Sequence, residues 1–199
     1  MLITLDGLSG TGKSSVALEL ASRLNLTSIS SGDYFRSIAY FIRKNNIDED
    51  QIDYSKLNDL KIKRVGSKVY LNDEDITSFL KTPDNNVLSA KIANIKEIQD
   101  IVDKIERNMM TERTIIDGRD VNVRFSNADY SFYLTASEDE RMKRMHSTKE
   151  EVASRDKWDL LGNIRKGNKL IEINTDNKTI EEIVEEIINI IGENKWECI

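Results

Sequence analysis

Apolar residues occur along this chain in short runs and in helical stripes, and the two patterns alternate. Five runs have the length of buried strands, at residues 2–5, 27–29, 114–117, 130–134 and 170–173. Helical patterns, with apolar residues at every third or fourth position, cover residues 14–24, 33–43, 84–109, 138–145 and 179–191. Such alternation is typical of a parallel sheet with helices on both faces. We therefore expect an α/β fold that binds its ligands at the carboxyl ends of the strands.

One segment departs from this alternation. Residues 61–72 are typical of a hairpin with its turn at Gly66-Ser67, which predicts an antiparallel insertion in the parallel plan. Residues 43–60 before it are polar and charged, and we interpret them as a solvated helix end and a connection.

The connection between the first strand and the first helix carries the strongest chemical signal. The stretch DGLSGTGKSS contains Gly7 and, after four residues, Gly12-Lys13-Ser14, which is the spacing of a phosphate-binding loop. Its glycines let backbone N–H groups approach phosphate oxygens closely, and the helix start adds a positive end. Lys13 would reach the β- and γ-phosphates, and the Ser14 hydroxyl would hold Mg2+. The alternative is a glycine-rich turn before an ordinary helix, but the strand-loop-helix context argues against it.

A second polar cluster, TIIDGRD, ends the apolar strand at residues 114–117. Asp117 would hold Mg2+ through water, as an acid on a neighbouring strand does in phosphate-loop enzymes. Arg119 offers a planar fork to a phosphate, and Asp120 would accept hydrogen bonds from a sugar or a base. The alternative interpretation is a salt bridge at the strand end.

Two further stretches bring arginines to polar segments. SSGDYFR, residues 30–36, follows the second strand and opens a helix, so its hydroxyls and Arg36 would meet an anion at a helix N-terminus. SRDKWD, residues 154–159, lies between the fourth and fifth strands, where Arg155 would cover a reacting phosphate.

Composition narrows the class of protein. A chain of 199 residues is long enough for one domain with a sizeable core. The net charge of −6 argues against general nucleic-acid binding, and no apolar run approaches the ~20 residues that cross a bilayer. Cys198 is the single cysteine, so no intrachain disulfide is possible and we expect a cytoplasmic location.

Several stretches together resemble the bacterial cytidylate kinases, within the nucleoside monophosphate kinases. They occur in the family's order over nearly the whole chain: ITLDGLSGTGKSS, SSGDYFR, VYLNDEDIT, IIDGRD, YLTASEDERMKRM, SRDKWD and LIEINTDNKTIEEIV. The resemblance implies a P-loop fold with a five-stranded parallel core, a small antiparallel monophosphate-binding insertion and a lid. It implies one kinase domain over residues 1–199, divided into a core (1–40, 110–145 and 165–199), an insertion (about 41–109) and a lid (about 146–164).

The same resemblance implies roles for single residues. The ATP-binding residues would be Gly7, Ser9, Gly10, Thr11, Gly12, Lys13, Ser14, Ser15, Arg144 and Thr175. The residues that bind the acceptor nucleotide would be Ser31, Arg36, Gln99, Arg119, Asp120, Arg155 and Asp159. Lys13, Arg119 and Arg155 would be catalytic, and Ser14 and Asp117 would hold Mg2+.

The chain departs from the family at the positions that read the base and close the lid. Ala90 and Gln99 stand where the family has a serine and an arginine that contact cytosine, although Ser89 would replace the serine after a one-residue shift. Gly162 stands at the position of the arginine that closes the lid, and Arg165 or Lys166 would be its substitute.

These residues predict a kinase that uses Mg2+ and ATP to phosphorylate a nucleoside monophosphate, CMP or dCMP first. Its partners would be ATP and that nucleotide, with no nucleic acid and no membrane, and we expect a monomer. One alternative is a P-loop kinase for another small acceptor. The other is a non-catalytic nucleotide-binding protein with an eroded lid.

Overall fold

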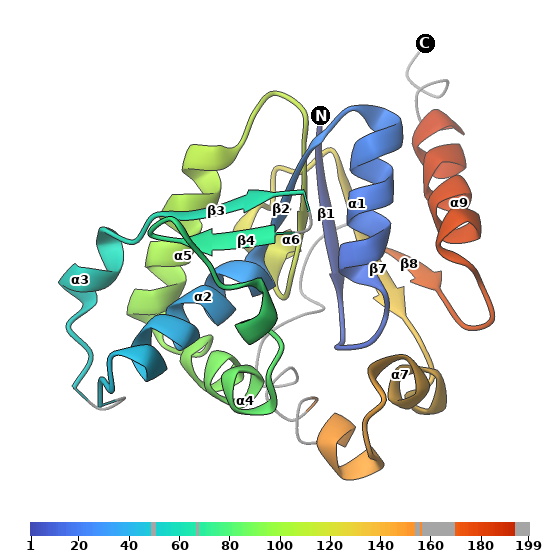
Figure 1. Ribbon diagram of the computed structural model, residues 1–199. Coiled ribbons are helices and arrows are strands. Elements are labelled where there is room, and N and C mark those ends of the chain that lie inside the picture. Colours follow the sequence, from blue (N-terminus) through green and yellow to red (C-terminus); the bar gives the residue numbers. More distant parts are fainter. Residues whose placement is uncertain (49–50, 67, 154–155, 157–169, 194–199) are drawn as a thin grey trace. The chain divides into compact units, whose positions relative to one another are not determined.

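The computed structural model describes residues 1–48, 51–66, 68–153, 156 and 170–193 (Figure 1). By its internal contacts the chain divides into two compact units, one of Met1–Ser30 and Met109–Ile199, the other of Ser31–Asn108.

The first unit is built on a five-stranded sheet in which every pair of neighbours is parallel. Its strands lie in the order β2 (Thr27–Ser30), β6 (Thr114–Asp117), β1 (Leu2–Gly7), β7 (Tyr130–Thr135) and β8 (Leu170–Asn174). All five predicted strands are therefore confirmed, each to within two residues.

Successive side chains of β1 point to opposite faces of this sheet, and helices contact both faces. Ile3 and Leu5 belong to the hydrophobic core formed with α1 (Lys13–Leu24) and α9 (Ile180–Glu193). Asp6 points to the opposite face and contacts α6 (Val121–Arg124). The predicted sheet with helices on both faces is confirmed, and α1 and α9 are seen side by side in Figure 1.

The position of β1 determines where a ligand of this unit would bind. The chain leaves β1 toward β2 on one side, and after β6 it continues to β7 on the other side of β1. Open parallel sheets bind ligands at such a change of direction, outside the carboxyl ends of the strands. The loops that follow β1, β6 and β7 all lie at that edge, and α7 (Glu138–Met145) follows β7.

The second unit contains the predicted hairpin. Strands β3 (Ile62–Val65) and β4 (Lys68–Leu71) pair antiparallel, and a short β5 (Glu74–Asp75) extends them to a three-stranded sheet. Its helical elements are α2 (Ser31–Lys44), α3 (Tyr54–Asn58), the 3-10 turn η1 (Thr77–Phe79), α4 (Pro83–Ile92) and α5 (Lys96–Met109), whose last residue falls in the first unit.

Two expectations for this unit need correction. Residues 43–60 are more than a solvated connection, because α3 forms there and buries Leu57 completely. The single helical pattern over residues 84–109 is two helices, α4 and α5, separated at 93–95. The Gln99 side-chain amide donates to the Ala93 carbonyl oxygen at 2.7 Å, which satisfies a carbonyl where α4 ends.

No helix among the residues that the structure describes is long and apolar enough to cross a membrane.

Candidate active site

The connection from β1 to α1 has the backbone of a phosphate-binding loop. Gly7 has φ +147°, and a Cβ there would lie 2.4 Å from the Leu134 carbonyl oxygen, so only glycine fits. Gly12 caps α1 in the left-handed region, with φ 92°. Lys13 is therefore the first helical residue, at the end of α1 where the backbone N–H groups are unsatisfied.

Side chains within the loop hold its shape. The Thr11 hydroxyl donates to the Leu8 carbonyl oxygen at 2.9 Å, and the Lys13 ammonium donates to the same oxygen at 2.8 Å. Thr11 is buried, whereas Lys13 is partly exposed. The lysine thus lies across the loop whose backbone would surround a phosphate. Ser9 and Gly10 complete the loop, and Ser15 follows Ser14 in the first turn of α1.

The two residues predicted to hold Mg2+ are in contact. The Ser14 hydroxyl donates to Asp117 Oδ2 at 2.8 Å, and the Ser30 hydroxyl approaches the same oxygen at 3.3 Å. Asp117 is 3% exposed. A hydroxyl and a carboxylate are oxygen ligands of the kind that Mg2+ prefers, with phosphate oxygens and water in its remaining positions. The donor set therefore fits this ion.

Arg119 and Asp120 follow β6 in a tight turn. The Gly118 N–H donates to the Leu5 carbonyl oxygen at 3.1 Å, and Arg119 Nη2 donates to the Ser9 hydroxyl at 3.1 Å. Asp120 adopts a left-handed conformation, with φ 56°, as the N-cap residue of α6. The structure thus brings the predicted arginine against the phosphate loop.

Asp6 is a residue of this region that sequence reasoning missed. Its carboxylate is completely buried and accepts hydrogen bonds from Val121 and Asn122. Burial raises the pKa of Asp6 to about 7, although these hydrogen bonds act to lower it. The signal for it in the sequence was a charged residue in an otherwise apolar strand, immediately before Gly7.

Arg141 is buried and pairs with Asp156, whose side chain is 19% exposed; the sequence did not reveal this pair either. Arg141, on α7, donates through Nη1 and Nη2 to both carboxylate oxygens of Asp156, each at 2.7 Å. Its side chain is only 5% exposed, and Nη1 also donates to the Ser9 carbonyl oxygen at 3.3 Å. Asp156 is thereby connected through Arg141 to the phosphate loop.

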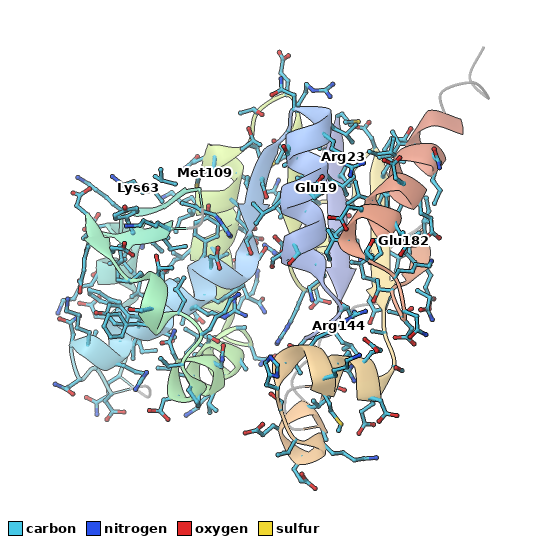
Figure 2. The ribbon with its side chains drawn as sticks, turned by 45° about the vertical axis from the view of Figure 1, so that its right-hand side comes forward. Glu19, Arg23, Lys63, Met109, Arg144 and Glu182 are labelled. Atoms are coloured by element: carbon cyan, nitrogen blue, oxygen red, sulfur yellow. The ribbon has the colours of Figure 1, made fainter. Side chains whose placement is uncertain are left out.

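Arg144 and Thr175, which are both predicted to bind ATP, are in contact. Arg144 Nη1 donates to the Thr175 hydroxyl at 2.9 Å, and Nη2 donates to the Thr175 carbonyl oxygen at 2.7 Å. Glu140 pairs with Arg144 Nε at 3.3 Å. These contacts hold the guanidinium plane of Arg144, which is labelled on α7 in Figure 2.

Two predicted acceptor residues lie on α2, in the second unit. Ser31 is buried at the first position of α2, and Arg36 Nε donates to Asn86 Oδ1 at 3.2 Å. Asp33 pairs with Arg36 at 3.8 Å and with Arg64 of β3 at 2.5 Å. Sequence reasoning missed Arg64, because nothing in the hairpin pattern indicates its pairing with a distant helix.

The positions that would read a base lie on α4 and α5 of the same unit. Ser89 is nearly buried and donates its hydroxyl hydrogen to the Asn86 carbonyl oxygen at 2.9 Å, whereas Ala90 offers no polar atom from its side chain. The side-chain NH2 group of Gln99 donates a hydrogen bond to the Ala93 carbonyl oxygen. Arg155, Asp159, Gly162, Arg165 and Lys166 lie outside the described residues.

The chain is similar in sequence to known proteins over nearly its whole length. The family model for cytidylate kinase matches residues 3–193. A cytidylate kinase of Carboxydothermus hydrogenoformans is 32% identical, over 96% of this chain and 97% of that protein. A cytidylate kinase of Clostridioides difficile is 33% identical, over 96% and 98%.

Solved structures show likeness in fold alone. TT1252 from Thermus thermophilus matches with a TM-score of 0.51 at 13% identity, over 97% of each chain. A gluconokinase from Sinorhizobium meliloti 1021 matches with the same TM-score at 14% identity, over 98% of this chain and 94% of that one.

Proposed function

The chain belongs to the cytidylate kinase family, and on this premise we propose that it transfers the γ-phosphoryl group of ATP to a nucleoside monophosphate, preferentially CMP or dCMP. The observation that carries the proposal is the pair of contacts Ser14–Asp117 and Arg119–Ser9. They join the phosphate loop to the polar turn after the neighbouring strand, and phosphoryl transfer depends on such side chains being positioned together.

ATP would be held by the first unit. The backbone N–H groups from Gly7 to Ser15 and the Lys13 ammonium would bind the β- and γ-phosphates. The ammonium would exchange the Leu8 carbonyl oxygen for a phosphate oxygen, which is a stronger, charge-assisted partner. Arg144 would lie against the adenine ring, because Thr175 and Glu140 hold its guanidinium plane.

Ser14 and Asp117 would hold Mg2+, directly or through water. When bound, the ion would neutralise charge on the β- and γ-phosphates and help to orient them.

The acceptor phosphate would be bound by Arg36 and Arg119. Ser31, Asp120 and Asp159 would hold its sugar, and Arg155 would close over the reacting group. Catalysis would consist of alignment of the two phosphates and neutralisation of their charge by Lys13, Arg119 and Arg155. An acceptor phosphate is already ionised at neutral pH, so no general base is required.

The organisation of the molecule is part of the proposal. We propose that residues 1–199 work as one kinase domain, with an insertion over about 41–109 and a lid over about 146–164. We further propose that the protein acts as a cytoplasmic monomer on small molecules, with no nucleic acid as partner. The single cysteine supports the cytoplasmic location, and the net charge of −6 argues against a nucleic-acid partner.

The altered base-reading positions favour one alternative, a kinase of the same fold with a different acceptor. The experiment that separates the two is a coupled assay of ATP consumption with CMP, dCMP, UMP and AMP, with and without Mg2+. We expect the highest kcat/KM for CMP or dCMP, and we expect activity to be lost when Mg2+ is removed. A preference for AMP, or ATP binding without turnover of any of the four, would contradict the proposal.

A further inference from the structure

Asp6 is a buried carboxylate that the proposed chemistry does not use directly. It is the last residue of β1 before Gly7, and its exposed fraction is 0%. A carboxylate is costly to bury unless hydrogen bonds satisfy its oxygens. Its partners therefore indicate why it is tolerated there.

All the hydrogen bonds that Asp6 accepts in the structure come from the start of α6. Oδ1 accepts from the Val121 N–H at 2.9 Å, and Oδ2 accepts from the N–H and the side-chain amide of Asn122, each at 2.9 Å. Val121 and Asn122 are the first two residues of α6. Such N–H groups have no partner within their own helix.

This arrangement replaces the usual cap of the helix. A side-chain oxygen of the N-cap residue normally accepts from the first turn. Asp120 occupies the N-cap position of α6, but its side chain makes no capping hydrogen bond. Asp6 performs that task from the adjacent strand, so the position of Asp120 is not determined by helix capping.

The turn that follows β6 is hydrogen-bonded to β1 at both of its ends, and Asp6 makes one of these two attachments. The turn of Gly118, Arg119 and Asp120 begins with the Gly118 N–H bonded to the Leu5 carbonyl oxygen at 3.1 Å. It ends where Val121 donates to Asp6, the next residue of β1. Both attachment points thus lie on consecutive residues of the strand that leads into the phosphate loop.

We propose that Asp6 is a positioning residue for phosphoryl transfer, because its carboxylate holds the Val121 and Asn122 N–H groups and thereby orients Arg119 and Asp120 toward the acceptor nucleotide. The inference rests on the proposed function for its substrate and on the contacts above for its geometry. Asp6 touches neither nucleotide and acts only through the turn.

The test compares Asp6→Asn with Asp129→Asn. Asparagine keeps the shape of Asp6 but presents an NH2 group to at least one N–H donor, so the turn loses an anchor. Asp129 is the matched control, since its Oδ2 accepts from the Leu2 N–H at 2.6 Å, at the opposite end of β1. The measurements are kcat and KM for ATP and for CMP, together with the urea midpoint of each variant.

For Asp6→Asn we expect kcat/KM for CMP to fall by about 10- to 100-fold, because a small misplacement of binding groups has effects of this size. KM for ATP should change by less than about threefold, and Asp129→Asn should stay within about twofold of the wild type in both. A lowered urea midpoint with unchanged kcat and KM for CMP would show a structural role only and overturn the inference.

A second variant covers the case in which Asp6→Asn does not fold. Asn122→Ala removes one of the three hydrogen bonds and should raise KM for CMP while KM for ATP stays constant. No change in KM for CMP would overturn the inference.

If the wild type phosphorylates no monophosphate, the proposed function fails by itself. Amide exchange then decides about Asp6: Val121 and Asn122 should exchange at least about tenfold faster in Asp6→Asn, and equal rates would overturn its anchoring role.

Discussion

Lys13 shows at the scale of one residue how the phosphate loop is prepared for its ligand. Its ammonium bonds to the Leu8 carbonyl oxygen at 2.8 Å, inside the loop that would surround the β- and γ-phosphates. Binding of ATP would exchange this carbonyl oxygen for a phosphate oxygen at the end of the lysine side chain. The positive charge is already in the loop before the phosphate arrives.

We expect Lys13→Ala to lower kcat by at least ~100-fold, because it removes a preorganised charge aimed at the transferring phosphoryl group. Steady-state assays with ATP and CMP measure the loss, and circular dichroism checks the fold. Lys96→Ala is the control, since Lys96 pairs with Asp100 on α5 and has no proposed role. Near-normal turnover in a folded Lys13→Ala protein would contradict phosphoryl transfer at this loop.

Asp6 makes stability depend on pH. Burial raises its pKa from the usual 3.8 to about 7 in the folded chain. Between these values the folded state binds more protons at this site than the unfolded state does, so the stability that the site contributes at low pH is lost as the pH rises through about 7. Groups shared by the wild type and Asp6→Asn cancel in the difference between the two proteins.

The unfolding free energy of the wild type relative to Asp6→Asn should therefore decrease by a few kcal/mol from pH 4 to pH 8, since one pKa unit corresponds to about 1.4 kcal/mol. Urea unfolding of both proteins at several pH values measures it. A difference independent of pH would mean that Asp6 is ionised throughout this range.

Gln99 is the residue proposed to read the base of the acceptor nucleotide. Strong discrimination between bases, by ~10⁴-fold, requires polar groups that a wrong base leaves unpaired. Here Ala90 offers none, and a hydrogen of the Gln99 amide is already given to the Ala93 carbonyl oxygen. Pyrimidine selection should thus persist in weakened form.

We expect CMP or dCMP to be the best acceptor and UMP to follow within roughly 100-fold in kcat/KM, which is about 2.7 kcal/mol. The measurement is kcat/KM for each nucleotide in the wild type and in Gln99→Ala, with Gln51→Ala as a control in the exposed connection before α3. A gap well above 100-fold would show that other residues, such as Ser89, read cytosine.

At the scale of elements, the sequence predicts those features that depend on neighbouring residues and misses those that depend on contacts between distant residues. The strand at 114–117 was predicted because an apolar run ends at charged residues, a local pattern. The break between α4 and α5 was not predicted, because the hydrogen bond from Gln99 to the Ala93 carbonyl oxygen leaves no mark in the apolar pattern. Periodicity over residues 84–109 does not distinguish one helix from two.

The same reasoning explains which site residues were found. The phosphate loop, Asp117 and Arg119 carry a spacing that is visible in the sequence, and the structure brings them together. Asp6 bonds to Val121, 115 residues away, and Arg141 bonds to Ser9, 132 residues away, in addition to Asp156. Such pairs are determined by the sheet order, which no single stretch reveals.

Arg141 links α7, the phosphate loop and Asp156. Loss of its ion pair should therefore lower the stability of the folded chain. Removing one partner of a fully buried ion pair leaves an uncompensated charge and costs about 3–5 kcal/mol. Because Asp156 is 19% exposed, Asp156→Ala should lower the unfolding free energy by at most about 3 kcal/mol, and adding Arg141→Met should restore a large part of it. Urea unfolding of the single and double variants tests this. Equal stability of the wild type and Asp156→Ala would contradict a buried pair.

At the scale of the whole molecule, the residues proposed for ATP belong to the first unit, and Arg36 and Gln99 belong to the second. A single kinase domain predicts that the two units unfold together. Each ligand then stabilises the entire chain, including the unit that it does not touch. Two independent domains predict separate transitions, each sensitive to its own ligand.

We expect one thermal transition whose midpoint rises with a non-hydrolysable ATP analogue alone and also with CMP alone. At 100 times its Kd a ligand stabilises the folded state by about 2.7 kcal/mol, and a chain of this length gains about 2–4 °C per kcal/mol. Each ligand should therefore raise Tm by roughly 5–11 °C. Differential scanning calorimetry measures the transition, and Lys13→Ala is the control, because it should weaken the response to the ATP analogue and preserve the response to CMP. Two transitions, of which the analogue moves one and CMP the other, would contradict a single cooperative domain.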